Sequence, residues 1–408
     1  MKKLRAVLGA AIVLGIAAAA ASVAGAKTGS TAVTAAGPSC KKATIGVTGP
    51  FTGPAASAGI DQRNWADLFV SYWNSGKPIP GTPKSLKRVK LAEIKADTQL
   101  NPQVAATVAV QLRANKAVLA VVGFSGSQEN VAGGPILRRG GLAFVSGSAT
   151  RASLTDPSTP DGHVLSNGFF HRVVPNDNAQ AAVDVTFLTK KLGIKAGETV
   201  MTVDQAEAYS VPLITLATQL LQKAGVKVDR QSQPATQTDF TSLAQKAVAE
   251  GAKAVMFAGQ VASNAQLFLQ QLKADGFNGK WISTDGTFDS SKFTVPGAYI
   301  SSFSLDVHQV KADAAIVADF KKRYGDTISF GAPTWVATQM IAHAISLACA
   351  DGRVTRSEVR ADLNKVKLST SLLGRPIAFQ KSGDVQGGIS FTIFQIGSDG
   401  KYNVVQPG

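Results

Sequence analysis

Two polar segments of the chain have residue types that suit the binding of a small anion. Each follows a short apolar run, the first at 117–123 and the second at 142–145. Their small or hydroxyl-bearing residues are Ser125, Ser127, Ser148, Ala149 and Thr150. Backbone N–H groups at turns and helix starts attract anions, and small side chains let an anion approach the backbone. The two segments together suit one carboxylate, but serine and glycine at such places also serve as helix caps, and the residues alone support both interpretations equally.

Residue patterns typical of enzymes are incomplete in the sequence. The segment G-F-S-G-S (123–127) is similar to a nucleophile elbow, but Ser127 stands where that motif needs glycine. No glycine-rich dinucleotide motif follows the first apolar run, and no phosphate-binding loop of the P-loop type is present. The histidines lack the spacing of metal ligands and lie at His163, His171, His308 and His343. We therefore expect no catalytic residue, no metal site and no cofactor.

The elements that position the two polar segments can be predicted from the spacing of apolar residues. The run 117–123 is continuously apolar, which is typical of a strand buried on both faces of a parallel sheet. Helical spacing is clear at Trp65, Leu68, Phe69, Tyr72 and Trp73. Further strands are expected at 43–48, 89–94, 142–146, 199–203, 226–229, 254–258, 281–284, 389–396 and 401–405. Further helices are expected after Asn101 and at 179–192, 211–224, 240–250, 263–274, 312–324, 334–350 and 355–366.

This alternation of strands and helices predicts an α/β fold. It runs from residue 43 to about 146 and resumes after Pro175, which with the chain length indicates two doubly wound, Rossmann-like lobes. In open sheets of this kind ligands bind beyond the carboxyl ends of the strands. Both polar segments lie at such ends, so the sequence predicts that they line one site.

The N-terminus has the pattern of a secretory signal peptide. Lys2, Lys3 and Arg5 precede an apolar run at 6–21, and Ala24-Gly25-Ala26 offers a cleavage site, so we expect a signal peptide at 1–26. A membrane anchor is the alternative, but the run is rich in alanine and barely long enough to span. Residues 27–40 read as a flexible leader.

Charge and cysteine content narrow the function further. The chain has 42 basic and 27 acidic residues, and loss of the three basic residues of the signal peptide leaves 39 against 27, or +12. These charges are scattered, and the densest cluster (84–90) lacks interleaved aromatics, so we expect a solvated loop there and no nucleic-acid partner. Cys40 lies too far from the apolar run for a lipid anchor. Cys40 and Cys349 either form one disulfide or stay unpaired, and the sequence leaves this open.

Several longer segments carry a resemblance to a known family. They are I-G-V-T-G-P-F-T-G-P-A-A-S-A-G (45–59), D-T-Q-L-N-P-Q-V-A (97–105), V-V-G-F-S-G-S (121–127), F-V-S-G-S-A-T (144–150), F-H-R-V-V-P-N-D-N-A-Q (170–180), T-D-F-T-S-L (238–243) and G-R-P-I-A-F-Q-K-S-G-D (374–384). In this order and spacing the chain resembles the branched-chain amino-acid binding proteins of ABC importers, which have the leucine-binding-like, type I periplasmic-binding fold. The resemblance implies two lobes joined by three crossing strands, near 171–175, 303–307 and 374–379. Lobe one would be 41–172 plus 305–375, and lobe two 173–304 plus 376–408.

The resemblance also implies roles for individual residues. Ser127 and Thr150 match positions that hold the ligand's α-carboxylate, flanked by Ser125 and Ser148, with Ala149 between the last two. Asp285 matches the acid that pairs with the α-ammonium, although aspartate is also a preferred helix N-cap. Tyr209 matches an aromatic that closes over the ligand, or else anchors its loop. The departures from the family pattern are Ala58, Gln260 and Val261, of which Gln260 is also expected in the pocket; they put the ligand's identity in doubt.

The function implied is capture of an amino acid or related small carboxylate between the lobes, by hinge closure. We expect an exported, periplasmic or secreted monomer without a lipid anchor, whose partner is the membrane permease of an ABC importer. A ligand-sensing receptor of the same fold is one alternative, and an exported α/β enzyme is another.

Overall fold

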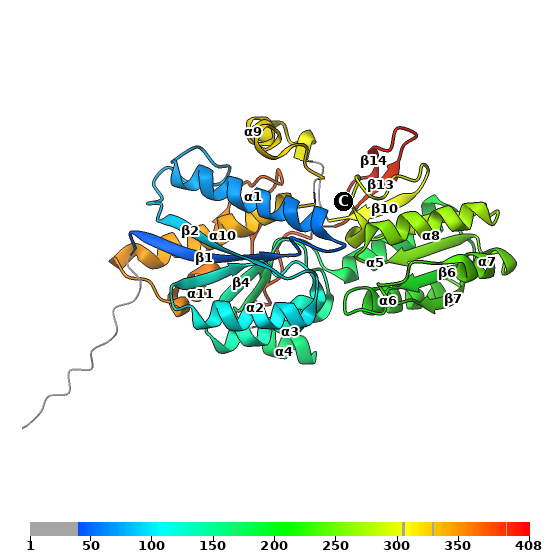
Figure 1. Cartoon of the computed structure of the whole chain (residues 1–408), viewed down its shortest axis with the longest axis horizontal. Coiled ribbons are helices and arrows are strands. Elements are labelled where there is room, and N and C mark those ends of the chain that lie inside the picture. Colours follow the sequence, from blue (N-terminus) through cyan, green and yellow to red (C-terminus); the bar gives the residue numbers. More distant parts are fainter. Residues whose placement is uncertain (1–39, 167, 304–306, 329, 389) are drawn as a thin grey trace, which may run out of the picture. The chain divides into compact units, whose positions relative to one another are not determined.

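The computed structural model of the chain describes residues 40–408, apart from 167, 304–306, 329 and 389. The predicted signal peptide (1–26) and nearly all of the leader lie outside these residues. The described chain contains a 5-stranded sheet, a 7-stranded sheet and a small 2-stranded sheet (Figure 1). Within this part of the chain, no helix combines the length and the apolar character that a membrane span requires.

The first sheet is parallel throughout, with the strand order β2-β1-β3-β4-β5. Its strands are β1 (Lys42–Gly49), β2 (Lys90–Asp97), β3 (Val118–Val122), β4 (Ala143–Ser146) and β5 (Phe170–Arg172). The helices around it are α1 (Ala56–Asn74), α2 (Pro102–Ala114), α3 (Ser127–Arg139), α4 (Pro160–Leu165), α10 (Ala332–Ala348) and α11 (Arg356–Leu363). One face of the sheet packs against α1 and α10 and the other against α2 and α3. Burial on both faces explains why β3 is apolar at every position.

The second sheet has the order β14-β13-β10-β9-β8-β6-β7. Its strands are β6 (Thr199–Asp204), β7 (Lys227–Ser232), β8 (Ala254–Ala258), β9 (Lys280–Ser283), β10 (Tyr299–Ser302), β13 (Thr392–Ile396) and β14 (Tyr402–Gln406). Its helices are α5 (Asp177–Thr186), α6 (Ser210–Lys223), α7 (Thr241–Ala249) and α8 (Ala262–Ala274). β13 and β14 pair antiparallel, whereas the pairs from β10 to β7 are parallel.

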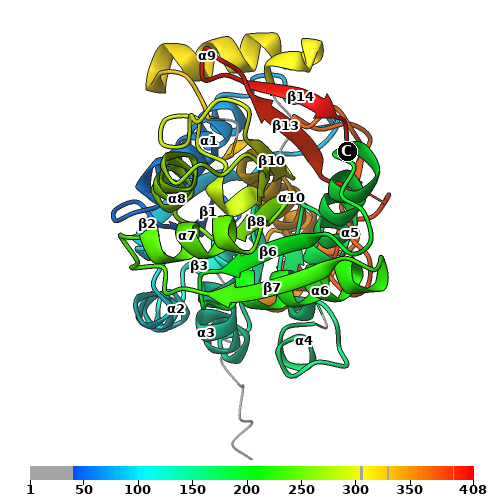
Figure 2. The same cartoon turned by 90° about the vertical axis from the view of Figure 1, so that its right-hand side faces the viewer.

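Helices also cover both faces of this second sheet (Figure 2). Successive side chains of a strand point to opposite faces. Val255 and Phe257 of β8 accordingly pack in the core beneath α7 and α8, whereas Ala254 and Met256 pack beneath α5 and α6. Both sheets thus have helices on both faces, as in doubly wound folds. The ends of their strands remain available to bind a ligand.

Shorter elements connect these layers. They are 3₁₀ turns at Ala152–Leu154, Asp285–Thr287, Val307–Gln309, Lys311–Asp313 and Cys349–Asp351, a π-helical turn at Phe187–Lys191, helix α9 (Ala314–Tyr324), and the strand pair β11 (Lys367–Leu368) and β12 (Ile377–Ala378). α9 packs on α1, where the rings of Phe320 and Trp65 stack with centroids 4.2 Å apart.

The structure confirms the predicted α/β class with parallel sheets, and it adds features that the sequence pattern did not indicate. β10 was not predicted, because Y-I-S-S carries no clear alternation. The expected crossing strand at 374–379 is reduced to β12, two residues that pair with β11. The crossing near 303–307 lies partly outside the described residues. The boundaries of the two lobes stay a prediction.

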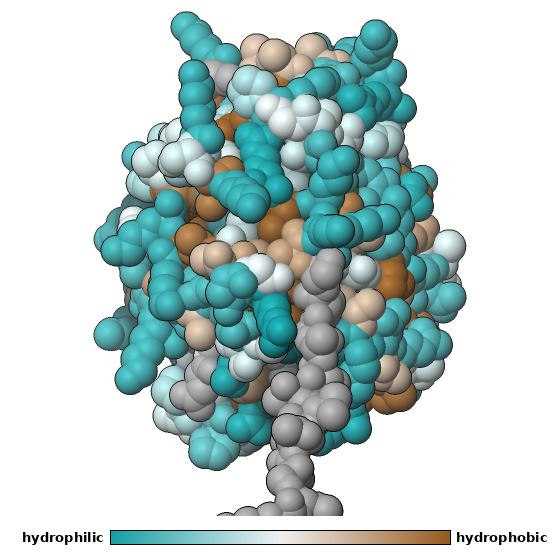
Figure 3. Space-filling view, turned by 90° about the vertical axis from the view of Figure 1, so that its left-hand side faces the viewer, coloured by the Kyte–Doolittle hydropathy of each residue, from teal (hydrophilic) through white to brown (hydrophobic). Residues whose placement is uncertain are grey.

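The charged residues are spread over the surface. Figure 3 shows one face on which hydrophilic side chains surround scattered hydrophobic residues. The exposed large hydrophobic residues, which include Val110, Val211, Val248 and Leu347, come from different helices. The exposed hydrophobic residues of the described chain therefore form no single patch, and the scattered lysines and arginines lie among them on a hydrated surface.

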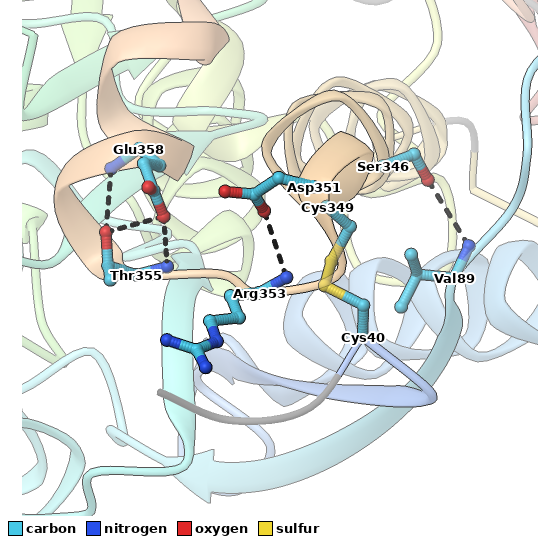
Figure 4. Close-up of a disulfide and its surroundings, with 8 residues drawn as sticks. All are labelled: Cys40, Val89, Ser346, Cys349, Asp351, Arg353, Thr355 and Glu358. Atoms are coloured by element: carbon cyan, nitrogen blue, oxygen red, sulfur yellow. Dashed lines mark hydrogen bonds between the residues drawn. A yellow bond between two sulfur atoms is a disulfide. The ribbon is translucent and has the colours of Figure 1, made fainter. Parts of the chain in front are cut away.

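A disulfide joins the start of the described chain to the end of α10. Cys40 and Cys349 are bridged with their Cα atoms 5.6 Å apart, across 309 positions of sequence (Figure 4). Cys40 precedes β1, so the bridge lies at the amino end of that strand. It anchors the first residues of the fold to a buried helix, and it settles the pairing that the sequence left open.

Replacing both cysteines should lower stability and leave ligand binding unchanged. A bridge that closes so long a loop restricts the unfolded chain, and native disulfides typically contribute about 2–4 kcal/mol. We expect the Cys40→Ser/Cys349→Ser double variant to lose about that much free energy of unfolding, measured with urea. Wild type unfolded with a reducing agent is the control and should match the variant. Equal stability of variant and oxidised wild type would contradict the prediction.

Candidate functional site

A pocket lies at the carboxyl ends of strands from both sheets. From the first sheet, its lining residues follow β1, β2, β3 and β4, and from the second they follow β6, β8 and β9. They are Pro50, Ala55, Ala58, Leu100, Ser125, Gly126, Ser148, Thr150, Tyr209, Gln260, Asp285, Gly286 and Phe330. The free volume inside is about 30 Å³, room for about one water molecule. Ligand sites in open α/β sheets are expected at these strand ends.

Ser125 and Ser148 form a hydrogen-bonded unit with Gln62 of α1. Ser125 Oγ donates to Gln62 Oε1 at 2.6 Å, and Gln62 Nε2 donates to Ser148 Oγ at 2.8 Å. Ser148 Oγ in turn donates to the carbonyl oxygen of Ser125 at 2.9 Å. Both hydroxyl protons are therefore used inside the protein. The unit fixes the two strand exits against each other, and any ligand contact of these serines would use their acceptor atoms or backbone.

Thr150 differs from its neighbours, because its donors are free. Among the described residues, none accepts a hydrogen bond from its N–H, and its buried Oγ1 has no partner either. The N–H groups on both sides are bonded, since Ala149 N donates to Ser146 Oγ and Arg151 N to Ser127 Oγ. A buried donor without a partner is costly. Thr150 thus presents an N–H and a hydroxyl at the pocket wall, a pair suited to one carboxylate.

Arg172 holds the loop that carries Thr150. Its Nη1 donates to the carbonyl oxygens of Ala149 and Arg151, at 3.1 and 2.8 Å, and the N–H of Asp177 donates to the carbonyl of Thr150 at 2.9 Å. All three carbonyls are thus directed toward these groups. Arg172 is fully buried, and its Nε is 2.7 Å from Asp384 Oδ1, which balances its charge. The clamp links the loop to the segment that precedes β13.

The opposite wall of the pocket is acidic. Asp285 follows β9 and is 3% exposed, and the hydroxyl of Tyr209 donates to its Oδ1 at 2.7 Å. Burial raises the pKa of Asp285 to about 7, although the Tyr209 hydroxyl lowers it in part. Burial together with the Asp285 charge raises the pKa of Tyr209, so Tyr209 stays protonated and acts as a donor. Two roles were considered for Asp285, a ligand-binding acid and a helix N-cap. Asp285 lies on the pocket wall as the first residue of a 3₁₀ turn, whose N-cap is Thr284.

Two further buried carboxyl groups lie on α5, and the first of them, Asp177, is beside Thr150, whose carbonyl accepts from the Asp177 N–H at 2.9 Å. Burial and the charge of Asp285 raise the pKa of Asp177 to about 8. Among the described residues, neither carboxylate oxygen of Asp177 has a hydrogen-bond partner; the Thr150 hydroxyl is close enough to lower that pKa in part but does not reach hydrogen-bond geometry. Asp184 is also fully buried, which raises its pKa well above the usual value, and it accepts from Ser301 Oγ at 3.1 Å. This end of the pocket therefore favours a cationic group.

The structure brings most of the predicted residues together. Ser125, Ser148, Thr150, Tyr209, Gln260 and Asp285 line the pocket. Ser127 and Ala149 lie just behind the wall, where Ser127 Oγ accepts from Arg151 N and Ala149 O accepts from Arg172. Their ligand contacts stay predictions.

Sequence reasoning missed Gln62, Arg172 and Asp177. Asp177 had a signal, because it follows β5 in the motif F-H-R-V-V-P-N-D-N and so lies at another strand exit. Arg172 lies inside a strand, where a charged residue among apolar neighbours indicates a buried pair. Gln62 lies within α1 and had no signal, because its role depends on two serines that are distant in sequence.

The pocket has the complementarity of a zwitterion site. The free N–H and O–H donors of Thr150 lie beside the buried carboxyl group of Asp177, and Asp285 lies on the part of the wall that follows β9. Among the described residues, no cluster of histidine, cysteine and acidic side chains is arranged to hold a metal ion. The chemistry of these groups suits a molecule that carries a carboxylate and an ammonium.

The comparisons with known proteins identify the family and the fold. The sequence matches the periplasmic binding protein family over residues 42–401. A leucine-, isoleucine-, valine-, threonine- and alanine-binding protein of Pseudomonas aeruginosa is 25% identical over 358 residues, which cover 86% of this chain and 89% of that protein. The isoleucine complex of LivJ from Streptococcus pneumoniae has a TM-score of 0.74 at 21% identity, covering 90% of this chain and 100% of that one. A solute-binding protein of Rhodopseudomonas palustris in complex with 3,4-dihydroxybenzoic acid has a TM-score of 0.72 at 18% identity, covering 90% and 97%.

The buried carboxyl groups make the stability of the unliganded protein pH-dependent. Aspartates of an unfolded chain titrate near pH 4, whereas Asp285 and Asp177 keep their protons to about pH 7 and 8. The folded state thus binds more protons, and the resulting stability is fully present below about pH 4 and is lost as pH rises through the folded pKa values. We expect a loss on the order of 1 kcal/mol per pH unit and group between about pH 5 and 7, measured by urea unfolding of protein refolded free of ligand.

Two variants test the origin of this pH dependence. Asp285→Asn should make the decline with pH shallower, because the variant side chain cannot titrate. Asp275→Asn, at the end of α8 and partly exposed, is the control and should keep the wild-type slope. A slope in Asp285→Asn equal to that of wild type would show that the pocket acid does not titrate in this range.

Proposed function

Because the chain belongs to the periplasmic binding protein family, we propose that it captures an α-amino acid in the pocket between its two sheets. The α-carboxylate would accept hydrogen bonds from the N–H and Oγ1 of Thr150. The α-ammonium would lie against Asp285 and Asp177, with Tyr209 beside them. No bond is made or broken in this function, so the site needs no nucleophile, base or metal.

The observation that supports the proposal is that unpartnered groups of both kinds lie together at the pocket. Among the described residues, the buried hydroxyl of Thr150 has no partner, and neither do the two buried oxygens of Asp177 beside it. A zwitterion satisfies both sets at once, since charge-assisted hydrogen bonds are the stronger kind. A structure of this fold holds isoleucine and another holds 3,4-dihydroxybenzoic acid, so the fold alone does not select the ammonium. The acidic wall of this chain does.

Entry of the ligand requires the pocket to open. An amino acid needs more room than about 30 Å³. Direct contacts already bridge the pocket, since Gln128 Nε2 donates to Gln260 Oε1 at 2.6 Å and Arg151 Nη1 donates to the carbonyl of Ala208 at 2.6 Å. Ser57 Oγ donates to Asp289 as a third bridge. In the proposed cycle these bridges break as a hinge opens, and a ligand that touches both walls favours the closed form.

The cellular role that follows is delivery of the solute to a membrane permease. The signal pattern at 1–26 places the chain outside the cytoplasm in this proposal. The closed, liganded form would dock on the permease of an ABC importer, which releases the amino acid.

Replacing either end of the head-group site should weaken binding of amino acids. We expect Thr150→Val and Asp285→Asn each to raise Kd by more than roughly tenfold, because the first removes the hydroxyl that donates to the ligand carboxylate and the second removes the charge that faces the ligand ammonium. The measurement is calorimetry with L-alanine, L-threonine, L-valine, L-isoleucine, L-leucine, L-asparagine and L-glutamine, preceded by a thermal-shift screen. A ligand at ~100 times its Kd adds about 2.7 kcal/mol of stability.

Matched controls separate loss of contact from loss of fold. Thr107→Val and Asp275→Asn make the same chemical changes away from the pocket and should bind as wild type does. Unchanged Kd in both pocket variants would exclude the proposed site. A thermal shift with 3,4-dihydroxybenzoic acid and none with any amino acid would exclude the ammonium.

A further inference from the structure

We infer that the amino acid bound here carries a primary amide at the end of its side chain, as asparagine and glutamine do. This inference rests on the proposed function and concerns the same pocket. It comes from three glutamine side chains, Gln128, Gln205 and Gln260, that meet beside the pocket. From the sequence, Gln260 is both a departure from the related proteins and an expected pocket residue.

Gln128 and Gln260 reach toward each other from different walls. Gln128 belongs to the first turn of α3, Gln260 follows β8, and Gln128 Nε2 donates to Gln260 Oε1 at 2.6 Å. Gln128 Oε1 is buried and has no partner. It lies over Gly126, since a Cβ added there would be 3.1 Å from it, and Gly126, Leu100 and Gln260 all line the pocket.

The single bond between the amides uses the NH₂ group of Gln128 and the oxygen of Gln260, so the oxygen of the first and the NH₂ group of the second lie outside this bond. Gln128 Nε2 also donates to the carbonyl oxygen of Leu100 at 3.4 Å, which supports nitrogen at that position. A primary amide carries one acceptor and one donor group, and it is therefore complementary to the pair.

Gln205, which contacts Gln260, has an amide nitrogen that is buried without a partner among the described residues. It follows β6 and is 1% exposed, its Oε1 accepts from the N–H of Gln260 at 2.9 Å, and its Nε2 is buried without a partner. A Cβ at Gly259 would collide with this amide, so glycine there lets the side chain lie beside Gln260. Gln205 thereby fixes the backbone from which Gln260 extends.

The surroundings suit an amide better than a charged side chain. Pro50, Ala55, Ala58, Leu100 and Phe330 line the rest of this region and would contact the methylene groups of the ligand. Glu129 is buried and is not part of the pocket lining; its carboxylate accepts from the N–H of Gly126 at 2.6 Å, and burial raises its pKa to about 7. A cation or anion from the ligand would have no oppositely charged partner among these lining residues.

An aliphatic side chain would leave the amide groups unsatisfied. A site that hydrogen-bonds a polar group rejects an analogue lacking that group more strongly than an apolar pocket rejects a poor fit. The buried oxygen of Gln128 would stay without a partner beside a leucine side chain, which is costly. Discrimination against branched aliphatic amino acids follows from this cost.

Calorimetry of the full mature chain with four probes tests the inference. Wild type should bind at least one of L-asparagine and L-glutamine with a Kd at least roughly tenfold below that for L-leucine and L-isoleucine. Gln260→Leu should lose this preference, by weaker amide binding and tighter leucine binding. Gln270→Leu, on the exposed face of α8, is the matched control and should keep it. Thermal unfolding of each variant verifies that the fold is retained.

Failure of the amide inference can be distinguished from failure of the proposed function. Wild type that binds L-leucine or L-isoleucine as tightly as both amides would overturn the amide inference and leave amino-acid capture intact. An unchanged preference in Gln260→Leu would overturn it as well; should that variant not fold, Gln128→Leu is expected to give the same loss of preference. Binding of none of the four probes, nor of L-alanine, would overturn the proposed function together with the inference.

Discussion

Buried carboxyl groups govern the rest of the site. The charge of Asp285 raises the pKa of Asp177, which the Arg172 guanidinium lowers only in part, and the charges of Asp285 and Asp177 raise the pKa of Asp184. Transfer of an ionised carboxylate out of water is costly unless it is paired. The pocket is therefore poised for an ammonium, which would lower those pKa values and ionise the wall. The free donors of Thr150 lie at the same pocket and suit an anion. In the proposed function a zwitterion would satisfy both sets of groups.

This arrangement depends on hydrogen bonds that hold the loops in place, so that the free donors of the pocket cannot bond to neighbouring protein groups. Arg172 holds the carbonyls beside Thr150, so the loop cannot turn its N–H inward. Gln62 uses the hydroxyls of Ser125 and Ser148 to join two strand exits. The doubly wound sheets place these exits together, because parallel strands all end at one edge. Rigid strands thus carry the site, and the disulfide secures the opposite, amino end of the first sheet.

The sequence was sufficient for the fold class and for part of the site. Continuous apolar strands such as β3 and alternation with amphipathic helices predicted parallel sheets, and serine-rich strand exits predicted the wall with Thr150. It was insufficient where function depends on contacts between distant residues. Gln62 and the Gln128–Gln260 pair are joined across 86 and 132 positions to their partners, and no local pattern marks them. The free donors of Thr150 likewise became evident only once its neighbours were seen to be bonded.

The central claim is that one amino acid spans the two walls with its carboxylate at Thr150 and its ammonium at Asp285. The most direct measurement is a crystal structure of the mature chain grown with L-glutamine and, separately, with L-leucine. We predict a bound amino acid whose carboxylate oxygens lie within about 3 Å of Thr150 N and Oγ1 and whose nitrogen lies at a similar distance from Asp285. A ligand bound in the reverse orientation, or outside this pocket, would contradict the account.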